Sequence, residues 1–468
     1  MKIEIPFGQK LVEATLPEGT DLLRMAEPEA IANPAEEIAG ALARPIGCEP
    51  LAVIAADRAA QARGRPRACV VVSDNTRPVP YKGADGILMP LVRTIANAGF
   101  AWGDICILVA TGTHRALAQY ELEAMLGPEP FELGIEVVNH DSRDASSLVD
   151  IGTTARGTKA CINRRYVEAD LKILTGLVES HFMAGASGGR KAICPGIFGE
   201  EGTFVFHSAK LMADPNSCDL QIKDNPVHEE SLAVAKMAGV DFIANVTLDG
   251  GFRITGVFFG ELEAAHAAAV AKLKSYVGIP TTTSYDLIIT HGGYVAMNHY
   301  QSAKAAVASL GALAQGGSLV MVADHRDPNP IGSDRYRTTL SLLKIIGAEA
   351  FDRVLASSGW TFIPDQWQVQ MWAKVFKRIA MHDFVYFAPQ LDDRDWRDLP
   401  GTDGRNLLSA DRRVSPELDD AATVIERAVA GFLAKRGFTA EDVAKGRCRI
   451  AWLADGPYGI PVSTPGNR

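Results

Sequence analysis

The chain has 468 residues, 47% of them hydrophobic and 22% charged, and carries a formal net charge of −9. This length predicts two or three domains with ample core, and the composition is that of an ordinary globular protein. The negative charge excludes the basic surface typical of nucleic-acid-binding proteins, and no apolar run approaches the ~18 residues of a membrane span. We therefore expect neither a nucleic-acid nor a membrane partner.

The seven cysteines stand singly, without a CxxC pair. An odd, dispersed set of cysteines is typical of reduced thiols rather than of a disulfide framework. The first residues also lack the apolar core of a signal peptide. We therefore expect a cytoplasmic protein.

The predicted elements alternate between strands and helices. Residues 1–19 alternate in polarity like a pair of hairpin strands. Five short, nearly continuous apolar runs follow, at residues 68–74, 105–111, 171–176, 287–293 and 318–324. Helical stretches such as 87–98 and 117–126 lie between them. Short apolar runs of this kind are typical of buried parallel strands, so the pattern predicts βαβ units and an α/β fold.

A domain boundary is expected at residues 278–284. An alanine-rich helix over residues 261–276 gives way there to the turn-rich sequence GIPTTTS, and a second α/β unit begins at Tyr285. Residues 389–416 are rich in Asp, Arg and Pro and have little periodicity, which predicts an irregular surface excursion.

These boundaries predict two α/β domains with mostly parallel sheets and an active-site cleft between them. The N-terminal, cofactor-binding domain is expected over residues 1–278. The strand that begins within residues 446–468 is expected to rejoin it. The C-terminal domain is expected over residues 285–445 and should contribute substrate-binding residues.

Polar motifs follow two of the predicted strands, where α/β sheets bind their ligands. In SDNTRP, Asp74 and Arg77 leave the first strand, and an arginine there can hold a carboxylate or a phosphate. The same residues also suit a plain turn in which Asp74 caps its own backbone. In ATGTHR, His114 follows the second strand, although a lone histidine is more often structural than catalytic.

A glycine-rich segment with a lysine lies within residues 179–207. Gly188 and Gly189 allow close approach of a ligand, and their N–H groups predict an anion cradle. Lys191 then supplies a positive charge or an amine nucleophile. No Ser or Thr follows Lys191, so this is not a Walker loop. The alternative interpretation is an ordinary helix N-terminus.

Two histidines flank Lys191 in the same segment, His181 ten residues before it and His207 sixteen residues after it. Either could be a core or capping histidine. A single histidine is also too few donors to hold a metal tightly. His207 makes sense as a metal ligand only where another group supplies the remaining donors.

The motif HYQSAK places Gln301 and Lys304 three residues apart, on one face of a helix. Taken alone, it indicates a solvated helix start slightly more than a binding site. Trp360, in SSGWT, is more often a packing residue than part of a pocket.

Taken together, these motifs resemble the nickel-dependent lactate racemase family. SDNTRP, ATGTHR, the array H-x9-K-x15-H around AGASGGRKAICPG, and YQSAK occur in the order and at the spacings of that family. The resemblance covers most of the chain, from Asp74 to at least Lys304 and less securely to Trp360. Several motifs in register are far more specific than any one of them.

The resemblance implies a cofactor, the nickel pincer nucleotide, which is a pyridinium mononucleotide whose thio acids bind Ni(II). Lys191 would be tethered to it covalently, and His207 would be the ligand that the protein gives to nickel, in a square-planar site that suits Ni(II). Asp74, with the turn at Gly188 and Gly189, would hold the nucleotide part.

The resemblance also implies the remaining roles. His114 and His181 would be the acid/base pair, and Arg77 and Lys304 would bind the substrate carboxylate. Gln301, Tyr300 and Trp360 would complete the substrate-binding residues.

The expected function is a racemase or epimerase that inverts C2 of a 2-hydroxy acid, either lactate or a larger, sugar-derived acid, by reversible hydride transfer to the cofactor. Its partners would be this small substrate and the proteins that build the cofactor and insert nickel. Two alternatives stay open. One is a transferase that binds a phosphate or nucleotide and uses Lys191 electrostatically. The other is a cofactor-carrying protein without turnover, which would need neither His114 nor His181.

Overall fold

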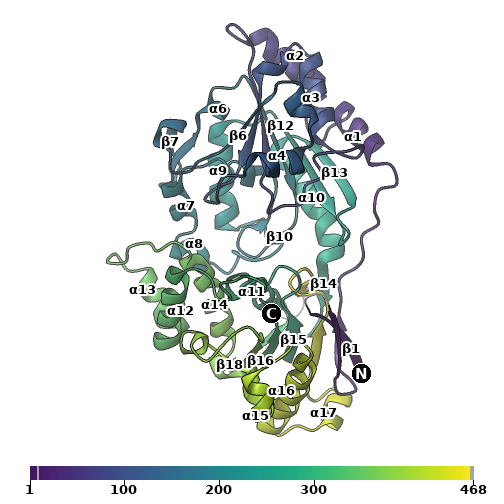
Figure 1. The fold of residues 1–468 in the computed structure, drawn as a ribbon, viewed down its shortest axis with the longest axis vertical. Coiled ribbons are helices and arrows are strands. Elements are labelled where there is room, and N and C mark those ends of the chain that lie inside the picture. The colour runs from purple at the N-terminus through teal and green to yellow at the C-terminus, as the bar shows by residue number, and fades with distance from the viewer. Residues whose placement is uncertain (8–9, 464–468) are drawn as a thin grey trace. The chain divides into compact units, whose positions relative to one another are not determined.

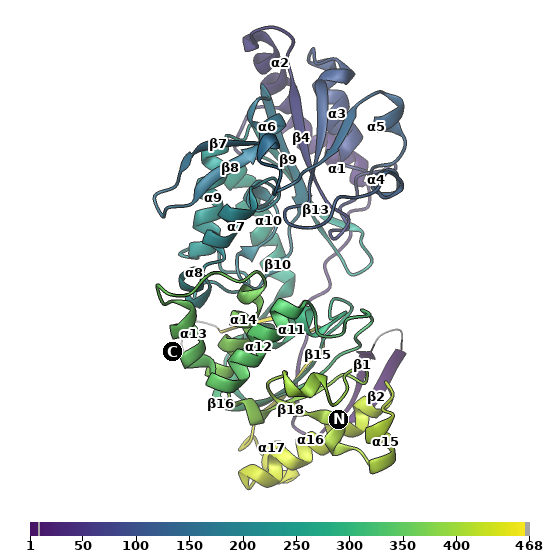
Figure 2. The same ribbon diagram turned by 60° about the vertical axis from the view of Figure 1, so that its left-hand side comes forward.

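The computed structural model describes residues 1–7 and 10–463, and it divides into two compact units (Figures 1 and 2). The N-terminal unit consists of Glu27–His207 and Asp214–Tyr276, and the C-terminal unit consists of Met1–Ala26, Ser208–Ala213 and Val277–Arg468. Each unit contains one six-stranded sheet covered by helices, as the α/β prediction requires. No helix in the described ranges is long and apolar enough to cross a membrane.

The sheet of the N-terminal unit is parallel except at one edge. Its strands run in the order β13 (Ile254–Gly260), β12 (Phe242–Leu248), β9 (Leu171–Leu177), β4 (Ala68–Ser73), β5 (Ile105–Ala110) and β6 (Glu136–Asn139). Only β13 is antiparallel to its neighbour. The chain starts this sheet at β4 and then adds β5 on one side and β9 on the other. Such a reversal of strand order opens a crevice at the carboxyl ends of the strands.

Amphipathic helices cover one face of this sheet. They are α1 (Pro34–Ala43), α2 (Leu51–Gln61), α3 (Leu88–Asn97) and α4 (Gln119–Leu126). In α3, Leu88, Leu91, Val92 and Ile95 recur at helical spacing and are buried against alternate side chains of the strands. The helices predicted over 87–98 and 117–126 are thus confirmed. The helix predicted over 117–126 corresponds to α4, at whose start the Glu121 carboxylate accepts a hydrogen bond from the backbone N–H of the capping residue Ala118.

The sheet of the C-terminal unit is wholly parallel. Its strands run in the order β18 (Thr402–Asp403), β17 (Phe384–Phe387), β16 (Leu313–Val322), β15 (Tyr285–His291), β19 (Ile450–Leu453) and β3 (Asp21–Leu23). The predicted strands at 287–293 and 318–324 are therefore present as β15 and β16. The connector predicted at 278–284 begins with a strand, β14 (Gly278–Thr281), which pairs with β20 (Ile460–Ser463).

Two predictions about chain segments need correction here. The strand of residues 446–468 does not rejoin the N-terminal domain, because β19 lies between β15 and β3 in the C-terminal sheet. The first 26 residues also belong to the C-terminal unit. The physical reason is burial, since Ile450 and Trp452 share one core with the N-terminal hairpin, and a strand's sequence does not specify its partner.

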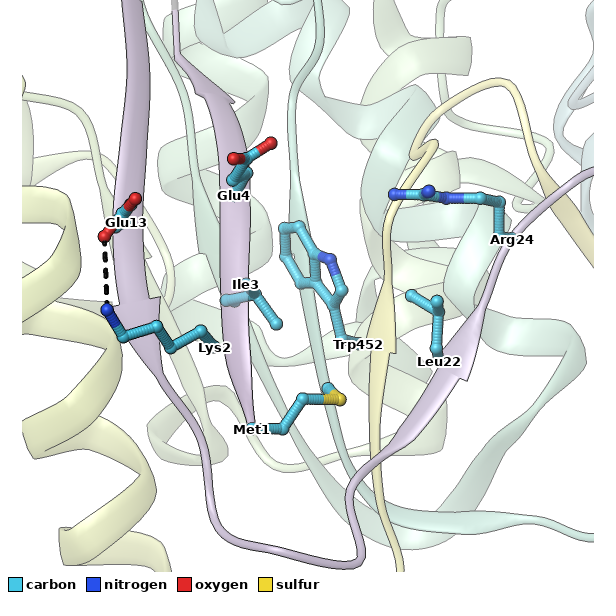
Figure 3. A pocket seen from close by; sticks show the side chains of 8 residues that line it. All are labelled: Met1, Lys2, Ile3, Glu4, Glu13, Leu22, Arg24 and Trp452. Atoms are coloured by element: carbon cyan, nitrogen blue, oxygen red, sulfur yellow. Dashed lines mark ion pairs between the residues drawn. The ribbon is translucent and has the colours of Figure 1, made fainter.

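That hairpin, β1 (Lys2–Phe7) and β2 (Lys10–Thr15), is the predicted strand pair. Together with α16 (Asp420–Arg436) it covers one face of the C-terminal sheet. A hollow of about 370 Å³ lies beside it, and the ion pair between Lys2 and Glu13 measures 3.8 Å. Figure 3 shows the lining side chains, with Trp452 near Ile3. None of the predicted site residues lines this hollow.

The other face of the C-terminal sheet carries α11 (His299–Ala308), α12 (Asp334–Ile346) and α14 (Gln366–Arg378). Residues 389–416 add the edge strand β18 and α15 (Ala410–Val414). The prediction of an irregular surface excursion is wrong for the middle of this segment. Arg405 is buried there and forms an ion pair of 2.7 Å with the buried Asp403, which anchors the chain to the sheet.

Candidate active site

Loops at the carboxyl ends of three neighbouring strands place the predicted residues of the N-terminal unit. Asp74 and Arg77 follow β4, His114 follows β5, and His181 follows β9. Because these strands are adjacent and parallel, their loops leave the same edge of the sheet.

Asp74 and His114 form a hydrogen-bonded pair. The Asp74 carboxylate lies 2.7 Å from Nδ1 of His114 and also accepts hydrogen bonds from the side chain and backbone of Thr76. Burial alone would raise the pKa of Asp74, but the hydrogen bonds from His114 and Thr76 outweigh it and the pKa is lowered. An ionised Asp74 therefore orients the His114 ring, as the aspartate does in an Asp–His pair of a hydrolase.

Arg77 is paired with an acidic residue of the neighbouring loop. Its Nη1 donates to the Glu179 carboxylate at 2.5 Å, and both side chains are about one-third exposed, at 33% and 39%. The guanidinium is thus held in a partly solvated ion pair. An anionic ligand of Arg77 would have to take the place of Glu179 or share the guanidinium with it.

His181 lies beside Lys191, with 3.2 Å between Nε2 of the ring and Nζ of the lysine. A short hairpin holds the ring, because His181 in β10 (Ser180–His181) pairs with Gly185 in β11 (Gly185–Ala186). The backbone N–H groups of Met183 and Ala184 donate to Nδ1.

These contacts assign the proton of His181. A neutral imidazole has one donor and one acceptor nitrogen, and Nδ1 is already an acceptor. In the neutral ring Nε2 is therefore the donor nitrogen, and it lies 3.2 Å from Nζ of Lys191. The uncharged form of a lysine amine is its nucleophilic form.

The glycine turn before Lys191 is shaped by the protein's own packing. Gly188 and Gly189 have φ of 75° and 51°, in the left-handed region that favours glycine. A Cβ at Gly188 would lie 2.7 Å from Val178, and one at Gly189 would lie 2.9 Å from the ring of His266. The predicted anion cradle is wrong for Gly189, because its N–H donates to the side chain of Asn245 at 2.8 Å.

A buried arginine holds this turn from behind. Arg190 is 1% exposed and donates to the carbonyls of Ala184 and Ala186 at 2.8 and 2.9 Å. Nε2 of His266 lies 3.0 Å from Arg190 and 2.8 Å from the carbonyl of Ser187. Burial lowers the pKa of Arg190 to about 9, so the guanidinium is still charged at neutral pH. Arg190 thus ties the turn and the second strand of the hairpin to the turn that carries Lys191.

Two buried histidines beside Arg190 predict acid sensitivity. Burial and the charge of Arg190 lower the pKa of His228 to about 2 and that of His266 to about 3, from 6.5. Below pH 6.5 the unfolded chain takes up protons that the folded protein does not. Stability contributed by the two histidines is therefore complete above that pH and is lost as the pH falls toward about 3.

When the pH falls from about 7.5 to about 5.5, each histidine should lower the free energy of unfolding by about 1.4 kcal/mol. The measurement is urea denaturation at the two pH values. Substitution His266→Gln should flatten this pH dependence. The matched substitution of the exposed His382 should leave it unchanged. A free energy that does not vary over this range in the wild-type protein would contradict the prediction.

His207 ends α7 (Glu200–Phe206) and is 9% exposed. Its Nδ1 lies 3.1 Å from the carbonyl of Thr203 and donates to it, so that Nε2 carries the lone pair. Burial lowers the pKa of His207 to about 3, and a protonated Lys191 adds to this effect. The ring is therefore neutral at physiological pH, which is the form that binds metals.

The predicted substrate residues of the C-terminal unit lie on or near α11. Tyr300, Gln301 and Lys304 stand within its first two turns, after the capping residue Asn298. Oε1 of Gln301 is buried and accepts no hydrogen bond from the described residues. The tyrosine hydroxyl accepts a hydrogen bond of 3.0 Å from Trp367.

Trp360 has a different partner. Its indole N–H donates to the side chain of Gln366 at 2.9 Å, at the start of α14. The structure thus brings Tyr300, Gln301 and Lys304 together on one helix, and it gives Trp360 a role in holding a turn.

With this geometry in place, the chain can be compared with known proteins. Two family models match it, the lactate racemase N-terminal domain over residues 7–219 and the lactate racemase C-terminal domain over residues 281–400. The chain is 32% identical over 398 residues to the lactate racemase of Lactiplantibacillus plantarum, which covers 84% of this chain and 89% of that protein. The chain belongs to the lactate racemase family.

Other comparisons agree. The lactate racemase of Thermoanaerobacterium thermosaccharolyticum is 31% identical over 379 residues, 80% of this chain and 85% of that protein. The solved lactate racemase apoprotein from the same organism has a TM-score of 0.80 at 27% identity, covering 98% of this chain and all of that one. A crystal structure of a Thermotoga maritima protein, with a TM-score of 0.59 at 15% identity over 89% of this chain and 98% of that one, shares the fold. Membership in the lactate racemase family makes the protein an isomerase, a racemase.

The nickel cofactor of the family can be tested against the donors present. Within the described ranges, no group of three or more His, Cys, Asp or Glu residues could hold a metal ion. His207 nevertheless presents a neutral ring. Its Nδ1 is hydrogen-bonded to the carbonyl of Thr203, and metal-binding histidines usually make such a hydrogen bond with the nitrogen that does not bind the metal. One such histidine fits a metal whose other donors an organic group brings with it.

Four residues that build this site are missing from the sequence prediction. They are Glu179, Arg190, Asn245 and His266. Arg190 stands next to Lys191, and no local sequence pattern indicates that its side chain is buried. For Asn245 a signal exists, because it interrupts the apolar strand FIANVTL.

Proposed function

We propose that this racemase inverts the C2 centre of a small 2-hydroxy acid, either lactate or a larger, sugar-derived acid. The proposed cofactor is the nickel pincer nucleotide, attached to Lys191 and bound to the protein through His207. The observation that carries the proposal is the contact of 3.2 Å between His181 and Lys191, which places an imidazole nitrogen beside the lysine amine. When bound, the cofactor supplies the acceptor that takes the C2 hydrogen as hydride and returns it.

The protein's part in this chemistry is proton transfer at the substrate hydroxyl. Loss of hydride from C2 becomes easier when a base takes the hydroxyl proton at the same time, which leaves a planar 2-keto acid. His114, held by Asp74 at 2.7 Å, is one candidate base, and His181 is the other. Inversion needs one such group for each face of the carbon, so each histidine would act as base in one direction and as acid in the other.

Asp74 and Arg190 take supporting roles in this proposal. Asp74 orients His114, and its contacts favour this role over binding the nucleotide. Arg190 fixes the turn of Gly188 and Gly189, which sets the position of Lys191. The glycines thus serve the cofactor by placing the lysine.

The proposed ligands of the substrate carboxylate are Arg77 from the N-terminal unit and Lys304 from the C-terminal unit. Gln301 adds a buried acceptor, while Tyr300 and Trp360 shape the surroundings of α11. Positive charge on two side chains would keep the 2-keto acid bound while it rotates to present its other face. Maturation would require the proteins that synthesise the cofactor and insert nickel.

The proposal predicts that deuterium at C2 of lactate stays largely on carbon during racemisation by the cofactor-loaded enzyme. The hydrogen would move as hydride and return to the same carbon, whereas removal as a proton would exchange it with water. The measurement is deuterium content of the product by mass spectrometry in the first turnovers. Product that has fully exchanged with solvent would refute the mechanism and leave the family assignment untouched.

In the same assay His114→Ala and His181→Ala should each slow racemisation in both directions by about 10²–10⁴-fold, the usual contribution of a general acid or base. The exposed His382, replaced in the same way, is the matched control and should keep full activity.

A further inference from the structure

A pair of cysteines lies at the other end of the strands that carry Asp74 and His114. In the parallel register of β4 and β5, Cys69 stands directly opposite Cys106. Adjacent strands are about 4.7–4.9 Å apart, within the 4.4–6.8 Å that a disulfide spans between Cα atoms. Register alone therefore brings the two residues within bridging distance.

Both side chains point to the same face of the sheet. Val70 and Ile107, which follow the two cysteines in sequence, belong to the core beneath α2 and α3. Because side chains alternate along a strand, Cys69 and Cys106 point to the opposite face. There the two thiols interact with each other.

The two thiols differ in access. Cys69 is fully buried, whereas Cys106 is half-buried and lines a hollow of about 510 Å³. Arg165 from the short helix α6 (Arg164–Val167) lines the same hollow and hydrogen-bonds Cys106. A reagent in this hollow would therefore meet Cys106 first.

The electrostatics agree with this order. The interaction with Cys69 lowers the pKa of Cys106, and Arg165 lowers it further, against the opposing effects of burial and of Glu136, which forms an ion pair with Arg165. The same interaction, together with burial, raises the pKa of Cys69 well above its usual value. An accessible thiol of lowered pKa next to an arginine, with a buried thiol beside it, is the arrangement of a reactive and a resolving cysteine.

We propose that Cys69 and Cys106 form an oxidisable dithiol that reacts with hydrogen peroxide. The Cys106 thiolate attacks one peroxide oxygen, forming an S–O bond, breaking the O–O bond and releasing hydroxide, which takes a proton to become water. The Cys69 sulfur then attacks the sulfenic acid, forming the S–S bond and breaking the S–O bond, and a second water leaves with the Cys69 proton. Two thiols are oxidised and one peroxide is reduced.

The site is distinct from the proposed racemase chemistry. It lies at the amino ends of β4 and β5, whereas the proposed acid/base residues follow their carboxyl ends. The product disulfide would bridge the two strands that hold the Asp74–His114 pair. The reaction can be followed on the full-length protein without any cofactor or turnover.

The test is treatment of the folded protein with hydrogen peroxide, followed by alkylation of free thiols and non-reducing peptide mapping. We expect a linked Cys69–Cys106 peptide and an intact mass lower by two hydrogens. Before oxidation, iodoacetamide should modify Cys106 about tenfold faster than Cys161, which is half-buried and whose pKa burial raises.

Variants separate the two roles. Cys69→Ser should leave the sulfenic acid on Cys106, trapped by dimedone, and Cys106→Ser should protect Cys69 from oxidation. Cys161→Ser is the matched control and should form the disulfide as the wild type does. The proposal is overturned if peroxide leaves both thiols of the wild-type protein free for alkylation after unfolding, or if the disulfide joins another pair. The wild-type map decides this even where a variant does not fold.

Discussion

Replacing Lys191 by alanine is expected to abolish covalent cofactor attachment and racemisation, while the protein stays folded. Lys191 is half-buried, and its side chain contacts His181 at 3.2 Å, so the substitution removes little core. Loss of one net hydrogen bond costs about 0.5–1.5 kcal/mol. The measurement is the intact mass of protein coexpressed with the cofactor pathway, together with its melting temperature.

Two further variants sharpen this test. Lys191→Arg should also lack the adduct, because a guanidinium keeps the positive charge but not the nucleophilic amine. Lys172 is the matched control, since burial lowers its pKa and makes it a second candidate amine in the same unit. Lys172→Ala should keep the adduct. Finding the adduct on Lys172 or another lysine in the wild type would show that the attachment site is wrong.

Replacing His207 by alanine is expected to remove nickel but to leave the organic cofactor on Lys191. The proposal gives His207 one coordinate bond and Lys191 one covalent bond, so the two losses should be separable. Nickel per protein should fall below about a tenth of the wild-type value, because changes even beyond the ligands cost about 10–100-fold in metal affinity. The measurement is metal content by mass spectrometry, with the intact mass of the same sample.

Because His207 is buried against Phe206, with ring centroids 4.0 Å apart, alanine leaves a cavity. His207→Phe fills that space without a metal-binding nitrogen, and it should lose nickel equally. His140 is the matched control. It is buried, burial lowers its pKa, and its Nε2 is hydrogen-bonded to the carbonyl of Phe198. His140→Phe should keep nickel in the protein that remains folded. Wild-type nickel content in both His207 variants would rule out this ligand.

Most strands and helices follow from local patterns. The apolar runs that became β4, β5, β9, β15 and β16 read directly as buried parallel strands, because both faces of such strands are covered. The motifs after β4 and β5 could likewise be placed at the binding edge of the sheet before any coordinates. Residue type and position along the chain carry this information.

Partners of the terminal segments and contacts of the site do not follow from such patterns. β19 reads as a strand in isolation, but its place between β15 and β3 depends on the shared core around Trp452. Gly189 reads as an anion-binding residue, but its N–H is taken by Asn245, which lies 56 residues further along the chain.

The sequence by itself therefore determined the α/β fold class, the family, and which residue types stand at the ends of the strands. Only the tertiary structure decided that Asp74 holds His114, that Arg190 is buried behind the turn, and that the Lys191 amine faces the ring of His181. The physical reason is range. Secondary structure arises from periodicity and backbone preferences between near neighbours, whereas ionisation and hydrogen bonding in the site arise from burial among residues far apart in sequence.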